Sequence, residues 1–204
     1  MRQSITPTKK VLGKVRVPGE RVPAERALLL AAIAEGESLV RFVPPGALRV
    51  VRLLRSLGID VATERDAFIV QGNGLRGLSP AEEIVDLREW GASGLLVIAV
   101  LAGQPFITRV MLGEHADWAE PLLTMLAFMG MEGQRETKAV YSLGKVDPVG
   151  AVHAGLDVGA DEKLAVLVAG LYCKGVTQMR ESSKNRNRME RFLRQRDVSV
   201  ERWR

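Results

Sequence analysis

Residues 18–40 read PGERVPAERALLLAAIAEGESLV, where a charged entrance precedes a run of apolar residues. The run ALLLAAIA at 27–34 is apolar on every side of a helix, which is typical of a helix buried in a protein core. Gly36 follows, and we expect it in a left-handed conformation at the end of the helix. The alternating segment SLVRFV at 38–43 then predicts a strand.

Two later stretches repeat this pattern, ASGLLVIAVLAGQPFITRVM at 92–111 and ADEKLAVLVAGLYCKGVTQMR at 160–180. Gly103 and Gly175 stand where Gly36 does, so the same left-handed helix ending is predicted for both. An amphipathic helix is expected after each unit, at 47–58, 118–130 and 187–197, and strands at 67–72 and 139–144 close the first two units.

The repetition predicts an α/β fold with a single pseudo-threefold domain of three βαβαββ repeats, approximately 12–75, 76–143 and 144–204. Each repeat has a helix too apolar to stand in water, so we expect these helices at the centre and the sheets outside. Equivalent helices then run roughly parallel. Their N-termini gather at one end, where free N–H groups and helix dipoles favour an anion.

The composition of the chain argues against several classes of protein. The chain is 47% hydrophobic and 26% charged, which argues against disorder. The longest apolar stretches are shorter than the ~20 residues of a membrane span, so no membrane partner and a cytoplasmic location are predicted. One cysteine and two histidines, without metal-ligand spacing, predict neither a metal nor a cofactor.

The net charge of +5 is located at the C-terminus. Residues 184–204 hold eight Lys or Arg and three Asp or Glu, so the rest of the chain is neutral overall. The predicted helix at 187–197 therefore has a basic face. Most such faces are simply solvated, and nucleic acid is an unlikely partner by this count.

Several segments match one family in order and spacing: LGKVRVPGE, ERALLLAAIAEG, LRSLGIDV, LAGQPF, EKLAVLVAGLYCKG and RESSKNRNRMERFL. On these segments the chain resembles the EPSP synthases (3-phosphoshikimate 1-carboxyvinyltransferases) and their relative UDP-N-acetylglucosamine enolpyruvyl transferase. In that family, two such domains enclose shikimate 3-phosphate and phosphoenolpyruvate in a cleft. The resemblance implies one of these two domains and a small anionic ligand of this kind.

The resemblance assigns substrate-binding positions to Arg21, Arg26 and Gly91. It assigns no catalytic residue, because the family's acid–base groups come from the other domain. Other family ligand positions differ here: Val22 lacks the family's hydroxyl, and Asp117 stands in place of an arginine. A carboxylate ~5 Å from an anion opposes its binding by roughly 3 kcal/mol at an effective dielectric near 20.

Carboxylates also stand at the starts of all three apolar helices: Glu20 and Glu25, Glu89, and Asp161 with Glu162. We hypothesise that they satisfy the helix dipoles and the free N–H groups there. Carboxylate side chains would then neutralise the positive helix N-termini, which ligand phosphates neutralise in the family. Pairing of Arg21 and Arg26 with Glu20, Glu25 or Glu89 is an equally open interpretation.

These observations favour a stand-alone, EPSP-synthase-like pseudoenzyme that acts as a binding or interaction protein. One alternative is half of a split transferase completed by a second chain, and another is RNA binding through the basic C-terminal helix. Trp90 and Trp118 either form a binding platform or cover a surface left bare by a lost partner domain. The second interpretation would favour a homodimer or a complementary domain.

Overall fold

The computed structural model describes residues 19–65, 67–131, 133–144, 147–150, 152–153, 159–179 and 194. Helices and strands alternate along the chain, which confirms the predicted mixed α/β class. The helices are α1 (Arg21–Ala32), α2 (Leu48–Ser56), α3 (Ala92–Ala102), α4 (Glu120–Phe128) and α5 (Ala160–Gly170), with a 3-10 turn η1 (Pro45–Ala47) before α2.

The strands form three sheets in the described residues. The first has the antiparallel order β1-β3-β2, formed by β1 (Glu35–Arg41), β3 (Ala67–Asn73) and β2 (Asp60–Glu64). The second has the order β4-β5-β7-β6, formed by β4 (Val85–Asp86), β5 (Ile107–Met111), β7 (Val140–Gly144) and β6 (Gln134–Arg135). The third pairs β8 (Val152–His153) with β9 (Gln178–Met179) in parallel, as β4 pairs with β5.

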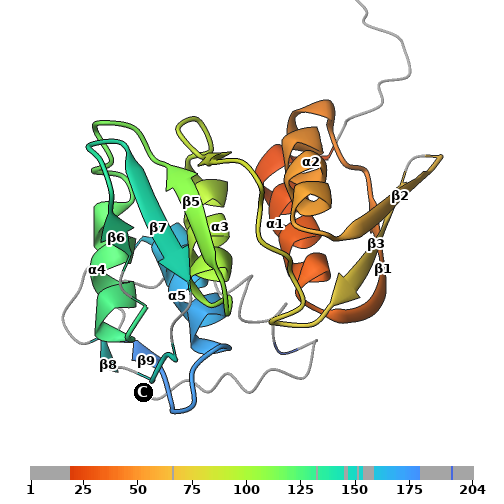
Figure 1. Cartoon of the computed structure of the whole chain (residues 1–204). Coiled ribbons are helices and arrows are strands. Elements are labelled where there is room, and N and C mark those ends of the chain that lie inside the picture. The colour runs from red at the N-terminus through yellow and green to blue at the C-terminus, as the bar shows by residue number, and fades with distance from the viewer. Residues whose placement is uncertain are drawn as a thin grey trace, which may run out of the picture.

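The order helix, strand, helix, strand, strand recurs along the chain. It is seen as α1-β1-α2-β2-β3 and again as α3-β5-α4-β6-β7, and α5 with β9 begins it a third time. Figure 1 shows the two larger sheets on opposite sides of the molecule, with α1, α3 and α5 between them. The predicted basic helix at 187–197 lies outside the described residues apart from Arg194.

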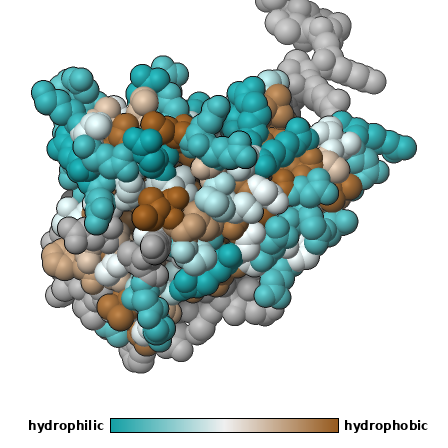
Figure 2. All heavy atoms as spheres, viewed as in Figure 1, coloured by the Kyte–Doolittle hydropathy of each residue, from teal (hydrophilic) through white to brown (hydrophobic). Residues whose placement is uncertain are grey.

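Helix α3 occupies the centre, and every residue from Ser93 to Ala102 is buried. This follows from a sequence without a polar face, because each fully buried Leu, Ile or Val stabilises the fold by about 1.5–3 kcal/mol. Met125, Met129 and Met131 are also buried, as expected of core-filling residues. On the face shown in Figure 2, apolar residues reach the surface in separate places between hydrophilic ones.

The helix endings agree only in part with the predictions. Gly58 and Gly130, where the two amphipathic helices were predicted to end, lie just after α2 and α4 with φ of +78° and +77°. Gly36 is left-handed, with φ +82°, but it lies within β1, after α1 has ended. The predicted left-handed ending is wrong for Gly103, whose φ is −82°, and Gly175 has no positive φ either. At Gly103 a glycine is required for a different reason, the ring of Tyr172 packed against it.

Within the described parts of the chain, no helix combines the length and the apolar character that crossing a membrane requires.

Candidate functional site

The first turns of α1, α3 and α5 meet at one end of the molecule. Glu25 of α1 contacts Ser93 of α3, and Arg26 of α1 pairs with Asp161 of α5. The helices therefore start at a common end, as the repeat pattern predicted. We call Glu25, Arg26, Arg49, Ser93 and Asp161 the entry cluster, because they stand where the three central helices begin.

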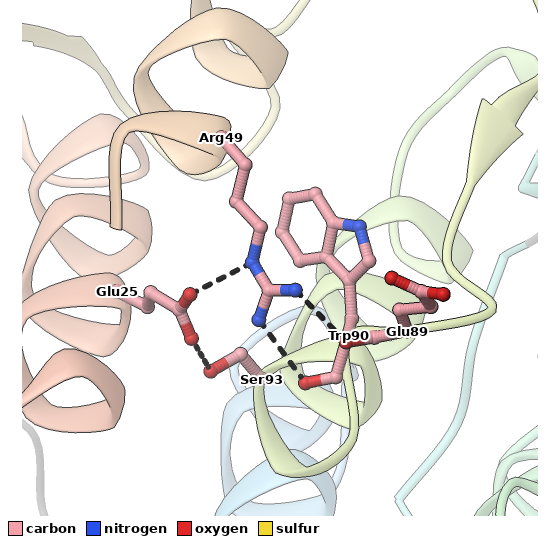
Figure 3. A network of polar contacts seen from close by, with 5 residues as sticks. All are labelled: Glu25, Arg49, Glu89, Trp90 and Ser93. Atoms are coloured by element: carbon pink, nitrogen blue, oxygen red, sulfur yellow. Dashed lines mark hydrogen bonds and ion pairs between the residues drawn. The ribbon is translucent and has the colours of Figure 1, made fainter. Parts of the chain in front are cut away.

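Glu25 is the centre of the first half of the entry cluster. Its side chain is 0% exposed, and the residues that follow Arg26 on the same helix are apolar. The Arg49 Nε donates a hydrogen bond of 2.8 Å to Oε1, and the hydroxyl of the buried Ser93 donates to Oε2 (Figure 3). A buried carboxylate is tolerated only when it is paired and hydrogen-bonded in this way.

Arg49, in the first turn of α2, joins Glu25 to the segment before α3. Its Nη1 donates to the carbonyl of Glu89 at 2.9 Å and its Nη2 to that of Trp90 at 3.4 Å. The guanidinium also lies 4.6 Å from the centroid of the Trp90 ring, within cation–π range (Figure 3). Arg49 thus ties the starts of α1, α2 and α3 together.

The two tryptophans are packed against the rest of the chain and do not form an exposed platform. Trp90 is only 8% exposed, and Trp118 is half-buried against the core. Both lie over Gly94 of α3, where an added Cβ would come within 3.0 Å of Trp118 Cη2 and 3.1 Å of Trp90 Cβ. Their burial contradicts an exposed binding platform and agrees with the interpretation that the rings cover part of the molecule. That a lost domain once lay there stays a hypothesis. The missing side chain at Gly94 lets the two residues close over the start of α3.

Arg26 and Asp161 make up the second half of the entry cluster. The Arg26 Nη2 donates to the Asp161 carboxylate, with side chains 14% and 42% exposed respectively. The Nε of Arg26 is buried and has no hydrogen-bond partner within the described residues. The expected partners of Arg26 were Glu20, Glu25 or Glu89. The structure instead pairs it with a carboxylate from the third repeat.

The other two sequence-predicted positions lie at the margin of the entry cluster. Arg21 is exposed in the first turn of α1, and its Cδ would be 3.1 Å from a Cβ added at Gly46, just before α2. Gly91 lies two residues before Ser93 with φ +53°, and open space surrounds the position of its absent Cβ. The structure therefore brings Arg26 into the cluster, but not Arg21 or Gly91.

Asp161 and Glu162 lie in the first turn of α5, where the helix dipole favours them, but the hypothesised side-chain caps are absent at the N-cap positions of the three helices. The residues at the N-cap positions of α1, α3 and α5 are Glu20, Gly91 and Gly159, and none makes a side-chain hydrogen bond to its helix. The partners of Glu25 and Asp161 are arginine side chains instead. In each pair, one guanidinium nitrogen donates a charge-assisted hydrogen bond to the carboxylate.

Sequence reasoning missed Arg49 and the role of Ser93. One signal was available: Glu25 precedes Leu28, Leu29 and Ala32 by three, four and seven residues, which places it on the apolar stripe of α1. A carboxylate on such a stripe requires a buried partner. The sequence does not indicate which of the many arginines supplies it.

The two cations of the entry cluster are balanced by two carboxylates, which leaves it with no net charge for an external anion. It also lacks metal-binding character, since no group of three or more His, Cys, Asp or Glu residues in the described chain is arranged to hold a metal ion. Its geometry is that of a closed, self-neutralised junction between four helices, α1, α2, α3 and α5.

The family profile and the curated proteins similar to this chain belong to one family. The sequence profile of EPSP synthase (3-phosphoshikimate 1-carboxyvinyltransferase) matches residues 5–203. The 3-phosphoshikimate 1-carboxyvinyltransferase of Gloeobacter violaceus is 34% identical over 205 aligned positions, which cover 94% of this chain and 46% of the relative. That of Thermus thermophilus is 33% identical over 199 positions, covering 93% and 46%.

Solved structures show the same relationship. An EPSP synthase from Acinetobacter baumannii superposes with a TM-score of 0.81 at 25% identity, over 94% of this chain and 46% of that one. The chain therefore spans about half the length of the curated relatives that it matches. The predicted resemblance to one of two domains is confirmed.

Proposed function

Because this chain belongs to the EPSP synthase family, we propose that it is a domain of that fold whose anion-binding end is closed by its own carboxylates, and that it acts as a binding or interaction domain. Arg21, Arg26 and Gly91 are proposed as the remaining positions of the family's substrate site. In this proposal, enolpyruvyl transfer is absent from the domain.

The pairing of Arg26 with Asp161 carries the proposal. Arg26 is the residue of the proposed substrate site that lies within the entry cluster, and its guanidinium already holds an anion from its own chain. A phosphate that approached Arg26 would meet the Asp161 carboxylate as well. At ~5 Å and an effective dielectric near 20, that repulsion is roughly 3 kcal/mol, about a hundredfold in affinity.

The Glu25 pair closes the second route for an anion. Arg49 already donates to a buried carboxylate and to two carbonyl groups, so a ligand would have to displace contacts within the core. Displacing one partner of a buried pair leaves the other charge uncompensated, which costs about 3–5 kcal/mol. Arg49 is therefore a structural cation in this proposal.

The test is calorimetric titration of the purified chain with shikimate 3-phosphate. We expect no heat of binding at millimolar ligand for the natural sequence. Asp161→Asn should release Arg26 and bring measurable binding, and the additional change Arg26→Ala should abolish it. The matched control is Glu162→Gln, which removes the same charge from the neighbouring residue and leaves the pairing of Arg26 intact.

Two results would overturn the proposal. One is micromolar binding by the natural sequence that weakens in Arg26→Ala, because the substrate site would then be functional. The other is equal binding by Asp161→Asn and Glu162→Gln, because the gain would then reflect net charge and not the release of Arg26.

A second candidate function follows from the length of the relatives. They are transferases about twice as long, so this chain is alternatively one half of a transferase that a complementary domain completes. Mixing the chain with the isolated complementary domain of the Thermus thermophilus relative tests this directly. Consumption of phosphoenolpyruvate only in the mixture, and its loss in Arg26→Ala, would favour this candidate over the first.

A further inference from the structure

A groove separates α2 from the segment 79–86 that leads into β4. Its volume is about 770 Å³, within the range of about 300–1,000 Å³ that is usual for ligand sites. Leu53 of α2 and Val85 of β4 contribute apolar surface to its lining. The groove shares Arg49 with the entry cluster but is otherwise a different surface, and its occupant is inferred independently of the proposed function.

Polar contacts fix both ends of the groove. At one end, the N–H of Ser79 donates to the carbonyl of Leu57 at 2.8 Å. At the other, Arg49 donates to the carbonyl groups of Glu89 and Trp90. These contacts join the two sides of the groove at both of its ends. The chain's own hydrogen bonds therefore define the groove without a partner.

The two sides carry opposite charges. Arg52 and Arg55 lie on the α2 side, and Arg55 is partly engaged through a 2.6 Å hydrogen bond to the Val61 carbonyl. The exposed Arg52 has no ion pair or hydrogen bond with any part of the chain that the structure describes.

The opposite side, formed by residues 79–86, is acidic, and two of its carboxylates have no partner in the described residues. Glu82 and Glu83 are exposed, and neither is paired within the described residues. Asp86, further along the same side, is already paired with Arg88 at 2.6 Å.

The opposite charges of the two sides restrict which kinds of molecule can bind in the groove. A nucleic acid or an anionic lipid surface presents phosphates throughout, and Glu82 and Glu83 would repel them. A polycation would be repelled by Arg52 and Arg55 in the same way. The groove complements a molecule that has one negative group for α2 and one positive group for the 79–86 side.

The length of the groove indicates how long a bound segment is. From Arg49 to Ser56, α2 rises ~10 Å at ~1.5 Å per residue, which three or four residues of extended peptide span at ~3.3 Å each. Successive side chains of an extended peptide point to opposite sides. We propose that the groove binds a short extended segment of a partner protein in which an acidic and a basic residue are adjacent.

The first experiment probes the intact chain with an array of immobilised hexapeptides. Each peptide has a central Glu-Lys or Lys-Glu pair between small or apolar residues, and a matched set has one alanine inserted within the pair. Adjacent charges should bind at least fivefold better than separated ones, since the insertion turns both side chains toward the same side. Equal binding of the two sets would overturn the proposal.

Variants then locate the binding, using fluorescence anisotropy with the best labelled peptide. Arg52→Glu and Glu83→Lys should each weaken binding about tenfold, because each places a like charge against the peptide. The double variant should prefer the peptide with the pair reversed. Arg41→Glu, the same change at an exposed arginine of β1 away from the groove, is the control and should leave binding unchanged. Circular dichroism checks that every variant is folded.

Other occupants give distinct results. Binding of single-stranded DNA or phosphatidylserine vesicles that is lost in Arg52→Glu and strengthened in Glu83→Lys would replace the peptide with a polyanion. Displacement of the labelled peptide by a free amino acid, which has the same two charges, would replace it with a small zwitterion. Either result, or the absence of any bound peptide in the array, overturns the proposal.

Discussion

Gly103 lies directly against the aromatic ring of Tyr172. A Cβ added at Gly103 would come 2.5 Å from Cδ2 and 2.6 Å from Cδ1 of that ring, closer than carbon atoms approach without displacement. The backbone of Gly103 has φ −82°, which any residue adopts. The glycine therefore serves the packing of the second repeat against the third.

This packing predicts the effect of Gly103→Ala. The added methyl group must displace a buried ring, and we expect the free energy of unfolding to fall by about 3 kcal/mol. Urea denaturation measures it. In a Tyr172→Ala background, the same change should cost almost nothing, because the space is then open. A loss of similar size in both backgrounds would place the strain in the backbone and contradict this interpretation.

Glu25→Gln tests the entry cluster. The change keeps the shape of the side chain but leaves Arg49 with no carboxylate partner in a mostly buried position. We expect a loss of about 3 kcal/mol in the free energy of unfolding, as for other broken buried pairs. The control is Glu20→Gln, at an exposed residue that makes no capping hydrogen bond. Stability within ~0.5 kcal/mol of the natural sequence for both variants would refute the assignment.

A pH dependence is expected from Glu136, which joins two strands of the second sheet. The Ser142 hydroxyl and, secondarily, the Arg109 guanidinium lower the pKa of this carboxyl below its usual 4.5. Since the folded pKa is the lower one, the stabilisation is present above pH 4.5 and is lost as the pH falls through the folded value.

The corresponding measurement compares the natural sequence with Glu136→Gln in urea denaturation at several pH values. The variant should be less stable at neutral pH, and the difference should disappear in acid. Asp86, whose pKa Arg88 also lowers, contributes equally to both proteins and cancels in the comparison. A stability difference that persists unchanged at low pH would show that packing, and not the charge of Glu136, is responsible.

Cys173 should react slowly with thiol reagents. Partial burial raises the pKa of its thiol, although a contact with Thr177 opposes this, so less thiolate is present near neutral pH. We expect labelling by a disulfide reagent at pH 8 to be at least tenfold slower in the native protein than in urea. Comparable rates would mean that the segment after α5 opens readily.

Much of the fold follows from local sequence pattern. The uninterrupted apolar run of α3 dictates a buried helix, because no polar face exists to meet water. The repetition of that run indicates three equivalent units whose helices start together. Gly58 and Gly130 mark the ends of amphipathic helices because a left-handed residue is cheap only for glycine.

The composition of the entry cluster depended on the tertiary structure. Arg26 and Asp161 are 135 residues apart, and no local pattern relates them. The apolar stripe of α1 requires a partner for Glu25, but only the packing of α1 against α2 and α3 selects Arg49 and Ser93. The sequence by itself determined where the apolar helices form and that their N-termini lie at a common end. Only the tertiary structure decided which charges pair there, because ion pairing depends on distances of a few ångströms between segments far apart in the chain.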